Sequence, residues 1–81
     1  MNEHERWLIG FGRAIRQLRA ERNISAGELA AAAGLTPRRL DAIESGRHDP
    51  RYDVLIALAR GLGVTPAVLV VRADEAKGGD A

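Results

Sequence analysis

Apolar residues recur at helical spacing near the start of the chain. Their separations of three and four residues place them on one stripe of a helix. They are Trp7, Leu8, Phe11, Ile15 and Leu18. Asn2 and Glu5 form a possible helix cap, whereas Gly10 and Gly12 lower the helix propensity. The pattern predicts a first helix over 13–22 and leaves open whether it begins before residue 11.

Two short helices follow, and each carries its own start and stop signals. Ser25 is a hydroxyl N-cap, and Glu28 three residues later completes the pattern of a capping box. An alanine-rich run then ends at a glycine, which predicts a helix of a little over two turns. Thr36 caps the next helix, and Pro37 takes its first position, where a missing N–H costs nothing. A Ser-Gly pair ends this third helix.

The second half of the chain predicts two more helices. After a short loop, apolar residues at helical spacing precede a glycine stop: Val54, Leu55, Leu58, Ala59 and Leu62. Thr65 and Pro66 repeat the signal of a cap followed by proline and open a short element over 67–73. The β-branched segment 68–71 leaves a strand as an alternative. Residues 74–81 are polar and are expected to form a flexible tail.

Five short helices with brief connections predict an all-α fold. The 81 residues suffice for one small domain, assigned to 1–73. Its core must be compact, because a chain of this size buries only about 60 to 65% of its unfolded surface.

Positive charge is concentrated in the N-terminal part. The net charge of +1 and the pI of 8.4 are weak signals for nucleic-acid binding by themselves. Nine of the 12 basic residues nevertheless lie before residue 52. The basic character therefore belongs to the first half of the chain and its following loop.

No residue pattern indicates an enzyme, a metal site or a cofactor. The chain has no Cys, and His4 and His48 are too few for a metal site. Ser25 and Ser45 have no evident His-acid partners, so nucleophilic catalysis is unsupported. The longest uncharged run, 61–71, is far shorter than the ~20 apolar residues of a membrane span, and no signal peptide fits the start. A soluble, cytoplasmic protein without a cofactor is expected.

The second and third helices, joined by a two-residue turn, match the layout of a helix-turn-helix. Ala30 and Ala33 would let the two helices approach closely, and Leu35 would fill the gap between them. The chain contains, in order, 13-RAIRQLRAERNIS-25, 28-ELAAAAGLT-36, 40-LDAIESGR-47 and 55-LIALARGLGVTP-66. This order resembles the compact five-helix DNA-binding domain of the lambda repressor/Cro type, also called the XRE family. The resemblance covers about residues 11–70.

The resemblance implies that the helix opened by Thr36 is the recognition helix and reads double-stranded DNA. Family members contact base edges with the exposed N-terminal half of this helix. The matching positions here are Pro37, Arg38, Arg39, Asp41 and Ala42. The start of the preceding helix and the loop after the recognition helix contact phosphates in the family. The matching positions are Ser25, Ala26 through its amide, Thr36, Ser45, Arg47, Arg51 and Tyr52.

The chemistry of arginine supports the base-reading role independently. An arginine near the start of a helix in the major groove can donate two hydrogen bonds to guanine O6 and N7. Arg38 is the first choice for this contact and Arg39 the second. Ala42 could touch a thymine methyl, and Asp41 could accept from cytosine or steer Arg38. The alternative is that Arg38 and Arg39 only form a solvated helix face.

The resemblance also implies a structural ion pair. In the family, an arginine of the first helix often pairs with the glutamate at the end of the recognition helix. Arg19 and Glu44 occupy these positions, so they are expected to lock the recognition helix to the first helix.

Val68, Val70 and Val71 suggest a surface for self-association. One of them, with Leu69, is expected to complete the core, and the others to form a self-complementary patch. The alternative is that all three belong to the core. Many family members carry a phosphate-anchoring Gln where this chain has Ala26, so a low affinity for a single half-site is expected. Dimerisation would raise the affinity, because two recognition helices could meet two half-sites.

The expected function is that of a sequence-specific transcriptional regulator, acting as a homodimer on an approximately palindromic operator. The alternative is a protein-interaction module or antitoxin-like adaptor on the same fold, with secondary or no DNA binding. Ala26 and the modest net charge favour this alternative.

Overall fold

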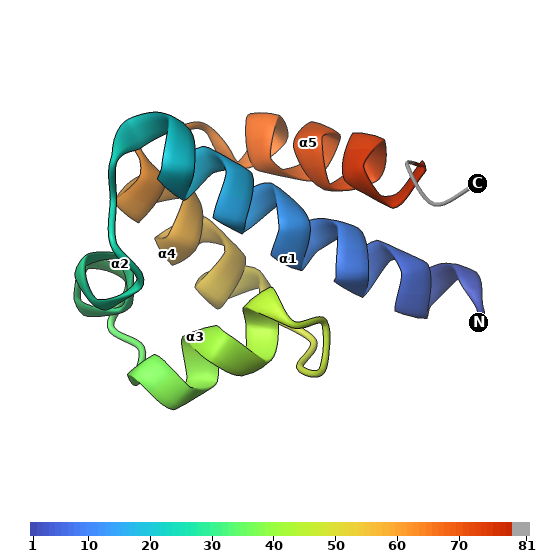
Figure 1. Cartoon of the computed structure of the whole chain (residues 1–81), viewed down its shortest axis with the longest axis horizontal. Helices are drawn as coiled ribbons and strands as arrows, with labels where there is room; N and C mark the ends of the chain where they lie inside the picture. The colour runs from blue at the N-terminus through green and yellow to red at the C-terminus, as the bar shows by residue number, and fades with distance from the viewer. Residues whose placement is uncertain (79–81) are drawn as a thin grey trace.

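The computed structural model describes residues 1–78, and within this range the chain forms five helices and no strand (Figure 1). The helices are α1 (Glu3–Arg22), α2 (Ala26–Ala33), α3 (Pro37–Glu44), α4 (Tyr52–Leu62) and α5 (Pro66–Gly78). The predicted all-α, five-helix fold is therefore confirmed. The β-branched segment 68–71 is helical, so the alternative of a strand was wrong.

Local capping sets the boundaries of the short helices as the sequence predicts. The Ser25 hydroxyl accepts from the Glu28 N–H at 3.0 Å, and the Glu28 carboxylate accepts from the Ser25 N–H at 2.8 Å. The Thr36 hydroxyl accepts from the Arg39 N–H at 3.1 Å at the start of α3. Helix α2 ends at Gly34, whose φ of 70° is a left-handed conformation that glycine adopts without strain.

Helix α1 begins earlier than the sequence predicts. Asn2 and Glu5 form a reciprocal capping box, and the helix continues without a break through Gly10 and Gly12. A Cβ at Gly10 would lie 2.4 Å from the carbonyl oxygen of Ala73, and one at Gly12 would lie 2.2 Å from that of Glu44. The two glycines therefore let α5 and the end of α3 approach the backbone of α1. Tertiary packing outweighs their low helix propensity.

Helix α5 extends beyond the predicted boundary of the domain. The expectation of a flexible tail from residue 74 is wrong for 74–78, which form the last turns of the helix. Arg13 donates to the carbonyl oxygen of Ala76 at 3.4 Å, and the Lys77 ammonium group contacts the carboxylate of Glu3. This hydrogen bond to Glu3 raises the pKa of Lys77. The rest of the predicted tail, 79–81, lies outside the described residues.

The core lies where α1 packs lengthwise on α5 and closes over α3 and α4 (Figure 1). Its buried side chains come from every helix: Phe11, Ala14, Ile15, Leu18, Leu29, Ala30, Leu40, Ile43, Leu58, Ala59, Leu62, Leu69 and Ala73. Trp7 stacks on Phe11 with 5.1 Å between ring centroids and packs against this core. Leu35, in the turn between α2 and α3, also packs against it.

Within residues 1–78, no single helix is long and apolar enough to cross a membrane. Among the described residues, α4 and α5 reach that length and composition as a pair, which is bent by 98°.

Candidate nucleic-acid interface

Helix α3 has one buried face and one exposed face. Leu40 and Ile43 are each 1% exposed and anchor the helix in the core. Arg38 lies on the opposite face, which it shares with Asp41, Ala42 and Ser45 because residues three, four and seven positions apart fall on one side of a helix. The burial of two aliphatic side chains thus fixes which side of α3 faces solvent.

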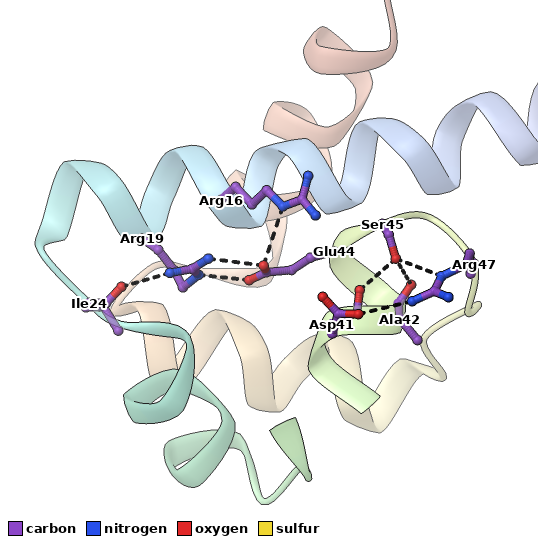
Figure 2. Close-up of polar contacts among 8 residues, drawn as sticks. All are labelled: Arg16, Arg19, Ile24, Asp41, Ala42, Glu44, Ser45 and Arg47. Carbon is purple, nitrogen blue, oxygen red and sulfur yellow. Dashed lines mark hydrogen bonds and ion pairs between the residues drawn. The ribbon is translucent and has the colours of Figure 1, made fainter. Parts of the chain in front are cut away.

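Glu44 attaches the buried side of α3 to α1. Its carboxylate accepts from Arg19 through two bonds, Nε–Oε2 at 2.8 Å and Nη2–Oε1 at 3.0 Å. Arg16 lies 3.5 Å from Oε1, and Arg19 also donates to the carbonyl oxygen of Ile24 at 3.3 Å (Figure 2). Glu44 is 6% exposed and Arg19 20%. The structure thus brings together Arg19 and Glu44, and the pair joins the end of α3 to α1.

Arg38 and Arg39 lie at the exposed N-terminal half of α3. Within residues 1–78, neither guanidinium group takes part in a hydrogen bond or an ion pair. Pro37 is exposed at the first position of the helix, and Ala42 is half-buried one turn further on. Arg39 lies at the edge of the face that Arg38 occupies. Both arginines are therefore free to meet an anionic or hydrogen-bond-accepting partner.

Asp41 is held by a contact that the sequence pattern did not predict. Its Oδ2 lies 3.1 Å from Nη2 of Arg47, whose Nε donates to the Ser45 hydroxyl at 3.0 Å. That hydroxyl donates to the carbonyl oxygens of Asp41 and Ala42 at 2.7 and 3.3 Å (Figure 2). Of the two expected roles for Asp41, steering of Arg38 is not seen in the described residues, where its carboxylate pairs with Arg47.

The remaining expected phosphate contacts are exposed at helix ends. Ser25 and Ala26 begin α2, where the first-turn amides have no partner within the helix. The Ser25 N–H donates to the Glu28 carboxylate, and this hydrogen bond is the main cause that lowers the pKa of Glu28. The Ser25 side chain lowers this pKa further. Thr36 caps the start of α3 and is also exposed. The N-termini of α2 and α3 are thus open to solvent.

Arg51 and Tyr52 begin α4 after the loop that follows α3. Arg51 is the N-cap residue of α4 but makes no side-chain cap hydrogen bond. Its side chain is exposed, and that of Tyr52 is 78% exposed. Both side chains therefore remain available to a partner.

The family of the chain follows from comparison with known proteins. The sequence pattern of a family described as helix-turn-helix matches residues 15–69. This range runs from the C-terminal part of α1 through α2, α3 and α4 to the first residues of α5. The chain belongs to the XRE-type helix-turn-helix family of transcriptional regulators. This confirms the resemblance, and the family is one of DNA-binding regulators rather than enzymes.

Relatives of this helix-turn-helix protein match most of its length. An uncharacterised HTH-type transcriptional regulator, y4dJ of Sinorhizobium fredii (strain NBRC 101917 / NGR234), is 36% identical over 70 residues, covering 86% of this chain and 88% of the relative. The clp gene regulator ClgR of Corynebacterium glutamicum is 28% identical with a TM-score of 0.80, covering 85% and 90% of the two chains. The restriction-modification controller protein C.AhdI of Aeromonas hydrophila is 29% identical with a TM-score of 0.74, covering 76% and 94%.

In this helix-turn-helix protein, α5 presents an apolar surface to solvent. Val68, Val70 and Val71 are 42%, 40% and 55% exposed. The expectation that one of them completes the core with Leu69 is therefore wrong, and so is the alternative that all three do. Leu69 completes the core instead, together with Ala73. An apolar groove runs along the exposed side and is lined by Ala67, Val68, Val71, Arg72 and Glu75.

Proposed function

We propose that this helix-turn-helix regulator binds a specific operator with the exposed face of α3 in the major groove. The observation that carries the proposal is the position of Arg38, exposed and unpaired in the described structure on the side of α3 opposite the core. A guanidinium group there can donate a bidentate pair to guanine, and the buried face of α3 holds it in place. An operator-binding protein acts where the DNA is, so the proposal places it in the cytoplasm.

Exposed groups around α3 support phosphate contacts on either side of the groove. The proposed set is Ser25, Ala26 through its amide, Thr36, Ser45, Arg47, Arg51 and Tyr52, all of which are exposed. Such contacts set the register of a protein on DNA and carry no base information themselves. Ala26 offers no side chain to a phosphate, which favours binding through two half-sites rather than one.

Replacing Arg38 with alanine is expected to weaken binding to the preferred sequence by about 1 to 3 kcal/mol and to relax the preference at one base position. The reason is the loss of two donors to one base edge, with no change in the core. Binding would be measured by selection from a random duplex library followed by titration of the selected duplex. Circular dichroism would confirm that the variant is folded.

Arg60 supplies the matched control for the loss of one positive charge. It is exposed near the end of α4, away from the proposed base-reading set. Arg60→Ala is expected to leave the preferred sequence unchanged. An Arg38→Ala variant that selects the same sequence as the wild type would refute the assignment of Arg38.

The exposed valines of α5 support a homodimer. A two-fold axis would bring the groove of one copy against that of another. Glu75 lies at the edge of the groove as an exposed carboxylate, whereas the Arg72 guanidinium group already pairs with Glu21 of α1. Two recognition helices could then meet half-sites about one helical turn apart, which predicts an approximately palindromic operator.

Replacing Val71 with glutamate is expected to raise the dimer dissociation constant about tenfold or more, because each interface would bury two unpaired carboxylates. Sedimentation equilibrium of the wild type and the variant would measure this change. Val70 is also exposed but lies outside the groove lining, so Val70→Glu is expected to weaken association less. A wild type that stays monomeric at high concentration would remove the dimer from the proposal.

The α5 groove also favours a second candidate function. An apolar surface of this kind suits a different protein as well as a second copy, and the chain would then act as an adaptor with secondary DNA contact. Ala26 at the start of α2 supports this candidate, because it offers no side chain to a DNA phosphate. Co-purification with a heterologous partner, together with an Arg38→Ala variant that keeps full regulatory function in cells, would favour the adaptor over the operator-binding protein.

A further inference from the structure

Arg47 folds back onto the exposed face of α3. Its Nε and Nη2 atoms, which share one edge of the guanidinium group, contact the Ser45 hydroxyl at 3.0 Å and the Asp41 carboxylate at 3.1 Å (Figure 2). The backbone N–H of Arg47 also donates to the carbonyl oxygen of Ala42 at 2.9 Å, which fixes the turn that brings the side chain back. A residue expected to contact phosphate therefore has its charge neutralised by a residue expected to face bases.

The Asp41–Arg47 pair is exposed and exchangeable. The two side chains are 71% and 68% exposed, and ion pairs at such positions contribute little to stability. A DNA phosphate can therefore compete for Arg47. The exchange leaves the Asp41 carboxylate unpaired within the negative field of the duplex, and this cost opposes the gain from the phosphate contact.

We propose that Asp41 determines specificity by keeping Arg47 away from the DNA phosphates. Arg47 is released only when a hydrogen-bond donor of a base takes its place as the partner of Asp41. The inference rests on the proposed DNA binding by α3. On an unrelated duplex no suitable donor faces Asp41, so Arg47 stays paired and adds little to the affinity. At the preferred sequence a cytosine N4 amino group donates to Asp41, and Arg47 is released to the backbone. The phosphate contact is then made only where the base is correct.

The Asp41→Asn variant tests the inference on a random-sequence duplex and on the duplex that the wild type selects. The variant is expected to bind the random duplex about twofold to fivefold more tightly, and its preference for the selected duplex should fall. Asp74→Asn removes one negative charge from α5, away from α3. Asp74 contacts Lys77 of the same helix. This control measures the effect of net charge alone.

The salt dependence of binding reports whether Arg47 contacts a phosphate. Each neutralised phosphate adds about 0.9 to the slope of log K against log salt. With Asp41 present, Arg47→Ala is expected to lower this slope on the selected duplex. On the random duplex, the slope of Arg47→Ala is expected to equal that of Arg60→Ala. In the Asp41→Asn variant, Arg47→Ala should lower the slope on both duplexes.

Two results would overturn the inference while the proposed function stands. One is that, with Asp41 present, Arg47→Ala lowers the slope of log K against log salt by the same amount on the random duplex as on the selected duplex. The other is an Asp41→Asn variant that binds the random duplex no more tightly than Asp74→Asn does. Failure of the proposed function is recognised separately, by a wild type that prefers no duplex or whose preference survives Arg38→Ala.

Discussion

Replacing Gly12 with alanine is expected to lower the free energy of unfolding by about 3 kcal/mol, at the upper end of the usual cost of overpacking. The added Cβ would lie 2.2 Å from the carbonyl oxygen of Glu44, 2.7 Å from its carbonyl carbon and 2.9 Å from the carbonyl oxygen of Ile43. These are backbone atoms, so no side-chain rotation relieves the contact. The end of α3 would have to move away from α1, and Ile43 would move with it.

Urea denaturation followed by circular dichroism would measure the change. Gly27 is the matched control, because a Cβ there meets only the Ser25 hydroxyl, at 3.9 Å. Gly27→Ala is expected to stabilise the protein by about 0.5 to 1 kcal/mol through helix propensity. A Gly12→Ala variant that matched the stability of Gly27→Ala would show that α1 and α3 tolerate the added methyl group.

Replacing Glu44 with alanine is expected to cost about 3 kcal/mol, the lower end of the range for breaking a buried ion pair. Removal of the carboxylate leaves Arg19 without its bidentate partner between α1 and α3. The value lies at the lower end because Arg19 retains 20% exposure and keeps its bond to the carbonyl oxygen of Ile24. Loss of DNA binding in this variant would report unfolding rather than a lost contact, so the folded fraction must be measured alongside.

Two further variants separate the pair from its surroundings. Arg16 is 52% exposed and lies 3.5 Å from the same carboxylate, so Arg16→Ala is expected to cost less than about 1 kcal/mol. The double change Arg19→Met with Glu44→Leu removes both charges and is expected to recover much of the loss. If Glu44→Ala cost no more than Arg16→Ala, the pair would not be what holds α3 to α1.

Most helix boundaries could be predicted because their signals are local. Ser25 with Glu28, and Thr36 with Arg39, satisfy first-turn N–H groups within three residues along the chain, and Pro37 has no N–H to satisfy. The errors lie at the start of α1 and the end of α5. The local capping box of Asn2 and Glu5 does mark the start of α1, but Gly10 and Gly12 argue against it because their packing partners are distant in sequence. The end of α5 depends on distant contacts as well. Lys77 with Glu3, and Arg13 with Ala76, connect the two helices across most of the chain length, which no local pattern contains.

The candidate interface was predicted unevenly for the same reason. The burial of Leu40 and Ile43 follows from helical periodicity, and with it the exposure of Arg38 on the opposite face. The pairing of Asp41 with Arg47 depends on how the chain turns after α3, because the two residues share no helical spacing. That turn decides which charges on α3 are free and which are already paired.

By itself the sequence determined the number of helices, the caps of the short ones and the family, because each depends on local spacing or on ordered motifs. Only the tertiary structure decided the roles of Gly10 and Gly12, since the close approach of two backbones is invisible to propensity. It also decided that Ala73, and none of Val68, Val70 and Val71, joins the predicted Leu69 in the core. All these valines are equally apolar in sequence, and the angle at which α5 packs on α1 selects the side chains that are buried.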